Sequence, residues 1–140
     1  MTLPAYLTLE IVTPDRPILR EQVDEVEVPG EDGYFGVLPG HTPLLASLQV
    51  GQLWYRKGSE IFYLSIAFGF AEVLPDHVTI LAQIAERAEE IDVSRAEAER
   101  QRAEAQLSRP AVAADFERAR VSLLKAMVRL NVANRARTRG

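Results

Sequence analysis

The sequence has 140 residues, of which 47% are hydrophobic and 26% are charged, a composition typical of one globular domain or of a small domain with an appendage. It contains no cysteine, which excludes disulfide frameworks and thiolate metal sites. No apolar run approaches the roughly 18 residues of a membrane span, and the first ten residues lack the basic region of a signal peptide. We therefore expect the chain to reach a membrane only indirectly, through a partner.

Charge is unevenly distributed along the chain. Residues 1–85 contain four Lys/Arg and eleven Asp/Glu, whereas residues 86–140 contain twelve Lys/Arg and nine Asp/Glu. The basic second part is a possible sign of nucleic-acid binding, but acidic residues are interleaved with its bases, and Phe116 is the one aromatic residue of the sequence after position 82. We therefore expect no nucleic-acid partner, and the asymmetry indicates two segments with different surroundings.

The first half of the chain has the pattern of short β-strands separated by turns. Leu7, Leu9 and Ile11 alternate with polar residues, which is the period of a strand with one buried face. The apolar run from 61 to 73 favours strands covered on both faces, and hence two packed sheets. Together these patterns predict an antiparallel sandwich or barrel. The strand-like segments are residues 7–11, 23–28, 52–56, 61–65, 68–74 and 77–81.

The composition changes after residue 82, where glycine disappears until Gly140 and alanine and charged residues increase. Residues 93–107 are strong helix formers, and Asp92 is well placed as the N-cap. The apolar face of this helix is mostly alanine, so it can bury little area. A break ending at Pro110 is followed by a second helix over about 112–134, whose apolar residues fall at spacings of three and four.

These segments define the fold class as α+β. An antiparallel β-sandwich is expected over residues 1–86, followed by a two-helix hairpin over residues 87–140.

Within the first helix Glu97 and Glu99 stand among Arg100 and Arg102, a spacing that allows local ion pairs of a few tenths of a kcal/mol each.

The stretch from Gly33 to Leu45 combines three glycines and two prolines with many apolar residues. Proline fixes φ and glycine permits positive φ, so the backbone is bent at defined points. The apolar side chains indicate a shaped loop that is pinned onto a sheet and holds His41 at a bend. Such a loop suits a docking surface, although a turn that only helps the sheet to fold has the same composition.

Catalytic chemistry has few candidate residues in this sequence. His41 and His77 are its only histidines, and it has no P-loop motif. Two separate histidines are a poor basis for a nucleophilic triad or a metal site. We therefore expect neither a catalytic nor a metal site, while a small enzyme that uses His41 with a neighbouring acid or base stays an alternative.

One pattern indicates a binding site for phosphate. Asp92 caps the first helix and Arg95 lies one turn further, so backbone amides, the helix dipole and a guanidinium come together. Arg102 lies two turns beyond Arg95, and Lys125 and Arg129 lie four residues apart on the second helix. If the helices fold back on each other, these cations can converge. An ordinary capped helix with surface arginines explains the same residues.

Four segments in this order resemble the family of ε subunits of bacterial F-type ATP synthases. They are Leu7–Arg16 (LTLEIVTPDR), Gly33–Leu45 (GYFGVLPGHTPLL), Ile91–Ala96 (IDVSRA) and Ala126–Arg135 (AMVRLNVANR). The resemblance implies a β-sandwich of about ten strands followed by two helices. It implies a non-catalytic subunit of the central stalk, or rotor, at the cytoplasmic face of the bacterial plasma membrane.

The same resemblance implies the partners. The subunit would lie beside the γ subunit and on the ring of c subunits, and would help to couple proton translocation to ATP synthesis. Residues that match the ring-docking motif are Gly33, Tyr34, Gly36 and His41. An alternative is a β-sandwich scaffold of another assembly, with the helices as a dimerisation arm.

The resemblance also implies a switch in the helices. Extended along γ toward the α and β subunits, the helices inhibit ATP hydrolysis in many members. Folded back in the compact state, they bind ATP in some members as a regulatory ligand. We expect no cofactor. The matching positions are Glu86, Ile91, Asp92, Arg95, Ala96, Arg102, Lys125 and Arg129. Lys125 is a departure from the family pattern, since the nucleotide-binding members have arginine at this position. Lysine keeps the charge of arginine but loses its bidentate fork.

Overall fold

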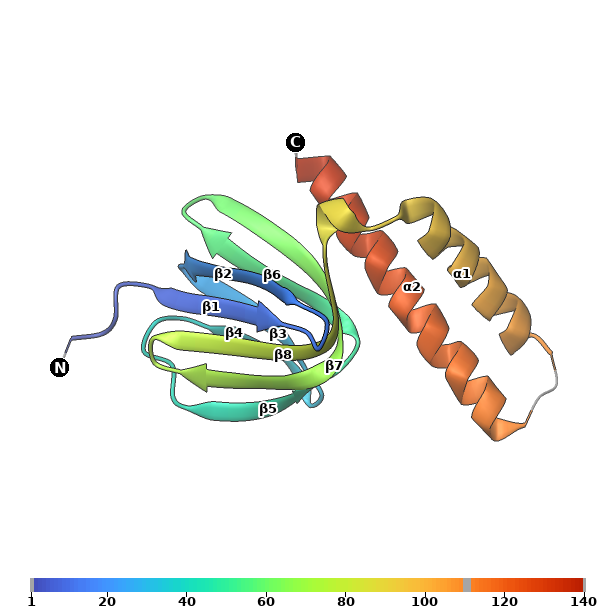
Figure 1. Ribbon diagram of the computed structural model, residues 1–140, viewed down its shortest axis with the longest axis horizontal. Coiled ribbons are helices and arrows are strands. Elements are labelled where there is room, and N and C mark those ends of the chain that lie inside the picture. Colours follow the sequence, from blue (N-terminus) through green and yellow to red (C-terminus); the bar gives the residue numbers. More distant parts are fainter. Residues whose placement is uncertain (1, 110–111, 140) are drawn as a thin grey trace.

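The computed structural model describes residues 2–109 and 112–139. Within these residues, eight β-strands are followed by a short 3₁₀ helix and two longer helices (Figure 1). The strands are β1 (Leu7–Val12), β2 (Pro17–Val23), β3 (Glu25–Gly30), β4 (Gly33–Val37), β5 (Leu44–Leu48), β6 (Gly51–Lys57), β7 (Glu60–Leu74) and β8 (His77–Arg87). The helices are η1 (Ala88–Glu90), α1 (Val93–Leu107) and α2 (Ala113–Arg139). The expected α+β fold is confirmed.

The sandwich has two layers of five strand segments, because β7 and β8 are long enough to take part in both. One layer has the order β2, β1, first half of β8, second half of β7, β5. The other has the order β4, β3, β6, first half of β7, second half of β8. The expected count of about ten strands therefore corresponds to ten segments carried by eight continuous strands.

One strand pairing differs from the expected antiparallel arrangement. β1 runs parallel to β8, with Thr8 opposite His77 and Val12 opposite Leu81. Parallel pairing needs a long connection between the strands, and most of the sandwich lies between β1 and β8 along the chain. The spacing of turn signals could not reveal this pairing, because turns report only on strands that are neighbours in sequence.

The main hydrophobic core lies between the two layers. Leu7, Leu9 and Ile11 are fully buried in it, as their alternation predicted. Tyr55 and Phe62 stack at the same core with ring centroids 5.0 Å apart, and burial raises the pKa of Tyr55. Among the described residues, the core cluster contains only strand residues, so the sandwich does not depend on the helices for its own packing.

A sharp bend in β7 allows this strand to join both layers. Phe68 has a φ of 62° and Gly69 a φ of 122°, and the pairing with β8 skips Phe68. The register with β8 is the same on both sides of this point, with Ala67 opposite Ile84 and Gly69 opposite Ala82, so no residue is inserted and the positive φ values make the bend. Gly69 is required here, because a Cβ would lie 2.0 Å from the carbonyl oxygen of Leu81.

The two helices begin and pack largely as the sequence predicted. The carboxylate of Asp92 accepts a 3.0 Å hydrogen bond from the Arg95 N–H, which confirms the N-cap. α1 buries only Ala96 and Ala103, which confirms its shallow alanine face. α2 continues to Arg139, five residues past the expected end. Pro110, which was expected to separate the two helices, lies outside the described residues.

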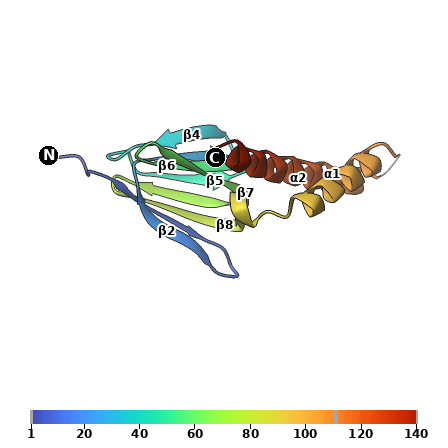
Figure 2. The same cartoon turned by 90° about the horizontal axis from the view of Figure 1, so that it is seen from above.

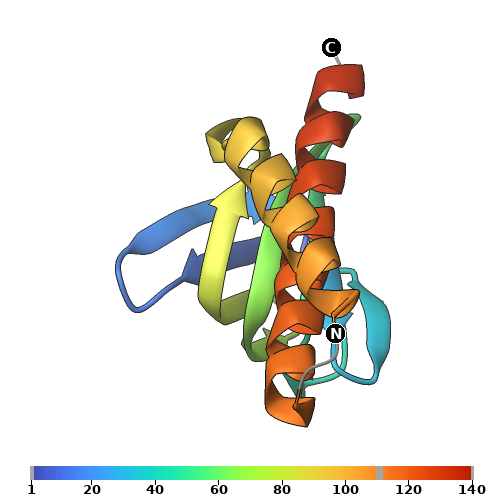
Figure 3. The ribbon, with the colours of Figure 1, turned by 90° about the vertical axis from the view of Figure 1, so that its right-hand side faces the viewer.

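The hairpin contacts the sandwich through the C-terminal half of α2. Ile91, Val132 and Ala133 form a small buried cluster there, against which Tyr63 of β7 and Val128 pack. α1 runs back along α2 (Figures 1 and 3), and both helices extend beyond the end of the sandwich (Figure 1). Neither of the described helices combines the length and apolar character that crossing a bilayer requires.

Replacing Gly69 by alanine is expected to destabilise the chain more than replacing Gly58, although both have a positive φ. A Cβ at Gly69 collides with backbone, whereas a Cβ at Gly58 meets no atom within 4 Å. We expect the free energy of unfolding to fall by at least ~3 kcal/mol for Gly69→Ala and by ~1 kcal/mol for Gly58→Ala. Urea denaturation measures both, and equal losses would contradict the close packing at the bend.

Candidate site where the helices meet the sandwich

Arg129 of α2 lies between the sandwich and α1, with only 15% of its side chain exposed. Its Nε and Nη2 donate to the two carboxylate oxygens of Glu86 at the end of β8, at 2.7 and 3.2 Å. Its Nη1 donates to Glu99 of α1 at 3.2 Å. One guanidinium therefore joins three elements, in the bidentate geometry that favours arginine over lysine.

Glu99 extends this network to a second guanidinium. Its other carboxylate oxygen accepts a 3.1 Å hydrogen bond from Arg95 Nε, four residues earlier on α1. The structure thus brings three of the eight candidate nucleotide residues, Glu86, Arg95 and Arg129, into one chain of ion pairs through Glu99. Of the local ion pairs that the sequence allows among Glu97, Glu99, Arg100 and Arg102, the structure forms the pair of Glu97 with Arg100.

Three further candidates have clear structural positions next to this network. Ile91 is buried in the cluster under α2, Asp92 caps α1, and Ala96 is fully buried. Ala96 directly follows Arg95 in the sequence. Its small, buried side chain allows α1 to pack closely against α2. These packing and capping roles account for the residue types whether or not a ligand binds.

The remaining two cations do not join the network. Arg102 is exposed on α1. Lys125 lies one turn before Arg129, but its ammonium sits over the ring of Phe68, 5.6 Å from the centroid. This is a cation–π contact, and it connects α2 to the bend of β7. The sequence analysis did not identify Phe68 as a contact of the helices.

The connection between β8 and α1 is held by a second set of contacts. Glu90 of η1 accepts a 3.0 Å hydrogen bond from Arg16 in the β1–β2 turn and a 3.3 Å bond from the Arg87 N–H. Burial opposes ionisation of Glu90, but these bonds outweigh it and lower its pKa. Arg87 also donates to the Ile18 carbonyl at 2.9 Å. The point where the chain leaves the sandwich is therefore fixed.

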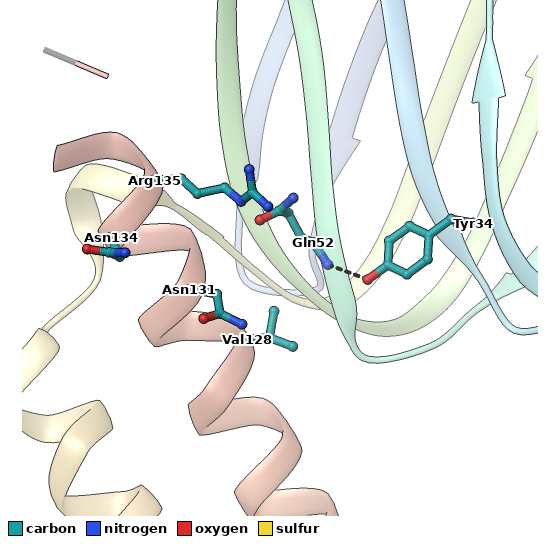
Figure 4. A pocket seen from close by; sticks show the side chains of 6 residues that line it. All are labelled: Tyr34, Gln52, Val128, Asn131, Asn134 and Arg135. Atoms are coloured by element: carbon teal, nitrogen blue, oxygen red, sulfur yellow. Dashed lines mark hydrogen bonds between the residues drawn. The ribbon is translucent and has the colours of Figure 1, made fainter. Parts of the chain in front are cut away.

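A polar groove of about 520 Å³ separates the last turns of α2 from the sandwich (Figure 4). On the sandwich side of the groove, the Gln52 N–H donates to the Tyr34 hydroxyl at 3.1 Å. On the helix side, the Arg135 guanidinium lies 5.5 Å from the centroid of the Tyr63 ring. Its lining residues are Tyr34, Gln52, Val128, Asn131, Asn134 and Arg135. Tyr34, a candidate ring-docking residue, therefore lies beside the helices.

The stretch Gly33–Leu45 is only partly a loop. It contains strand β4, a turn over residues 38–43, and the start of β5. Tyr34 lies at one end of β4 and His41 beyond the other, where the Gly40 N–H donates to the Pro75 carbonyl at 2.7 Å. Gly33 and Gly36 are exposed on β4. The four candidate docking residues thus follow one strand instead of gathering at a loop tip.

His41 has surroundings that count against the enzymatic alternative. Its Nδ1 lies 2.6 Å from the carbonyl oxygen of Thr42, the adjacent residue. Among the described residues, no carboxylate is recorded in contact with its ring, so a general-base pairing is not formed there.

Comparison with known proteins accounts for the whole architecture. The family model for the β-sandwich domain of the ATP synthase delta/epsilon chain matches residues 6–88, and the model for its long α-helix domain matches residues 89–134. The chain belongs to the ATP synthase delta/epsilon chain family. The resemblance stated from the sequence motifs is thereby confirmed.

Relatives of this delta/epsilon family chain match it over most of its length. The ATP synthase epsilon chain of Syntrophobacter fumaroxidans is 51% identical over 129 residues, covering 92% of this chain and 96% of that one. The ATP synthase epsilon chain of Solibacter usitatus is 47% identical over 133 residues, covering 95% and 99%. A chain in a cryo-EM structure of the Euglena gracilis mitochondrial ATP synthase (OSCP, F1 and c-ring) has a TM-score of 0.81 at 26% identity, covering 99% of this chain and 84% of that one.

The delta/epsilon chain has an exposed apolar surface on the layer that α2 does not cover. We call it the outer apolar face; it consists of Leu45 on β5, Phe70 on β7 and Leu81 on β8, which are 71%, 54% and 53% exposed. Phe70 and Leu81 are directly opposite each other across the strand pair. Apolar side chains grouped on adjacent strands in this way are typical of a protein–protein contact.

Arg129→Ala is expected to release the hairpin from the sandwich. The substitution leaves Glu86 and Glu99 near each other without the cation that neutralises them, and breaking a largely buried ion pair costs about 3–5 kcal/mol. Hydrogen exchange of the C-terminal half of α2 should accelerate, while the sandwich core keeps its protection. Arg118→Ala is the control, because Arg118 is 78% exposed and should change exchange little. Unchanged exchange in Arg129→Ala would show that the network does not hold the helices.

Proposed function

We propose that this chain is the ε-type subunit of the central stalk of a bacterial F-type ATP synthase, helping to couple proton translocation to ATP synthesis. The observation that carries the proposal is that both domains of the delta/epsilon chain match in order, over residues 6–134. The chain would act without catalytic chemistry of its own. It would lie at the cytoplasmic face of the plasma membrane and reach the membrane through the ring.

The outer apolar face is the proposed contact with the γ subunit. Leu45, Phe70 and Leu81 lie on neighbouring strands of a rigid sheet, so they present a fixed surface to a partner. Rigid contact suits a rotor, because torque is transmitted only if the subunits do not slide over each other. Burying such side chains supplies about 25 cal/mol per Å² of apolar area removed from water.

The proposed contact with the c ring runs along β4. This strand pairs only with β3 in the described part of the chain, and it forms one edge of the molecule, opposite β2 (Figure 2). Tyr34 near its start and His41 beyond its end lie too far apart for a single loop tip, so contact by both requires the ring to meet the length of the strand. Gly33 and Gly36, which have no side chains, would allow close approach.

The helical hairpin is the proposed inhibitor of ATP hydrolysis. It docks on the sandwich through a small cluster around Val132 and through the Arg129 network, while α1 itself buries only two alanines. Undocking therefore exposes little apolar area and opens one main polar network. The released helices would extend along γ toward the α and β subunits and oppose rotation in the direction of hydrolysis.

ATP is the proposed regulatory ligand of the compact state, bound near Arg95 and Arg129 with Glu86, Ile91, Asp92, Ala96, Arg102 and Lys125 around it. A ligand shifts the equilibrium toward the docked helices only by its higher affinity for that state. The support is the convergence of Arg95 and Arg129 on one carboxylate, which gathers positive charge from both helices. Binding of ATP to the intact chain is required, and its absence in calorimetry would contradict this proposal.

Phe70→Asp is expected to weaken binding to an isolated γ subunit at least ~30-fold, because a charge in an apolar contact loses its hydration and the ring contributes ~2 kcal/mol or more. Titration of γ with the purified chain measures the effect. Val112→Asp is the matched control, since Val112 is also well exposed, at 67%, but lies directly before α2, away from the outer apolar face. Equal binding of both variants would place the γ contact elsewhere.

Deleting the chain from Ser94 onward is expected to raise ATP hydrolysis by the reconstituted catalytic head while leaving assembly intact. No described residue beyond Ala85 belongs to the core cluster, so the sandwich should fold and bind γ without the helices. Steady-state hydrolysis and co-purification are measured on the same preparation. Unchanged hydrolysis in a fully assembled complex would remove the inhibitory role.

A further inference from the structure

The carboxylate of Glu99 is shared between two guanidiniums that come from different helices. One oxygen accepts from Arg95 Nε on α1 at 3.1 Å, and the other accepts from Arg129 Nη1 on α2 at 3.2 Å. Two guanidiniums that converge on one small anion are the arrangement by which proteins receive oxyanions in general. Here the anion belongs to the chain itself.

The charges around Glu99 balance only while it is present. Glu86 takes the bidentate fork of Arg129, and Glu99 accepts from the remaining Nη1 of Arg129 and from Nε of Arg95. Without the Glu99 charge, two guanidiniums would face one carboxylate. Arg95 is 73% exposed and Glu99 31% exposed, so an anion from solvent can reach this position.

Other acidic residues of α1 do not share this geometry. Glu97 and Glu104 both pair with Arg100, within the same helix. Such pairs contribute a few tenths of a kcal/mol and leave the neighbouring helix untouched. Glu99 is thus distinguished from its neighbours by its bond to α2, and Glu97 offers a control with the same charge on the same helix.

We propose that Glu99 is a resident anion in the position that a ligand phosphate would occupy between Arg95 and Arg129. The inference rests on the proposed binding of a nucleotide by the hairpin, and adds that a phosphate must displace Glu99 to bind. Glu99 then has two effects: it holds the hairpin docked in the absence of ligand, and it lowers the affinity of the site for phosphates. The affinity of the site for a phosphate therefore depends on this competition as well as on the number of cations.

Glu99→Ala removes both the charge and the side chain, and should open the site. We expect sodium tripolyphosphate to bind the full-length Glu99→Ala chain at least about tenfold more tightly than the wild-type chain, since one competing charge is removed. Glu97→Ala should bind as the wild type does. Isothermal titration calorimetry measures all three, and equal affinity of the Glu99→Ala and wild-type chains would overturn the proposal.

Hydrogen exchange supplies a second readout that does not depend on affinity. Without ligand, Glu99→Ala should lose protection in the C-terminal half of α2, and millimolar tripolyphosphate should restore it by bridging Arg95 and Arg129. The double variant Glu99→Ala/Arg129→Ala should show neither the gain in affinity nor the rescue. A gain that persists in the double variant would overturn the assignment to Arg129. Because the sandwich core contains no helix residue, these variants should remain folded.

Titration with ATP separates this inference from the proposed nucleotide sensing. If Glu99→Ala gains affinity for tripolyphosphate while no chain binds ATP, Glu99 is the resident anion and sensing of ATP is contradicted. If the wild-type chain binds ATP, and Glu99→Ala binds ATP and tripolyphosphate no more tightly than the wild type does, sensing stands and the role of Glu99 is overturned. If neither ligand binds any of the chains, both proposals fall.

Discussion

The position of the helices depends on the guanidinium of Arg129. A cation with 15% of its side chain exposed has lost much of its hydration, and it is tolerated because two carboxylates surround it. Those carboxylates come from β8 and α1, so neutralising one charge fixes three elements. The apolar contacts of the hairpin with the sandwich are few, and a small polar network therefore has a large influence on whether the helices are docked.

The two faces of the sandwich are used differently. α2 covers part of one outer face, through Tyr63 and Val128, whereas the opposite layer exposes Phe70 and Leu81. Since the main core is complete within the strands, movement of the helices leaves the second face unchanged. The fold thus separates a surface suited to a permanent partner from a helical pair suited to switching.

The sequence predicted what depends on local periodicity and failed where distant residues decide. The alternation of Leu7, Leu9 and Ile11 and the cap at Asp92 are local signals, and both were confirmed. The bend at Phe68 depends on how β7 pairs with two layers, and the pairing of Glu99 with Arg129 joins residues 30 positions apart. A spacing argument assigns Glu99 to its neighbours on α1, because only the folded chain brings α2 within reach.

The contact between Lys125 and Phe68 accounts for the lysine at position 125. A phosphate contact favours the planar fork of arginine, but the Lys125 ammonium lies over the Phe68 ring, where a compact point charge is sufficient. Phe68 adopts a left-handed φ, a conformation that costs about 1–2 kcal/mol for a residue with a side chain. The bend therefore presents an aromatic face to α2, and the lysine completes a contact between helix and sandwich. Among the α2 cations that contact the sandwich, Lys125 and Arg135 pack on aromatic rings of β7, and Arg129 forms ion pairs with Glu86 and Glu99.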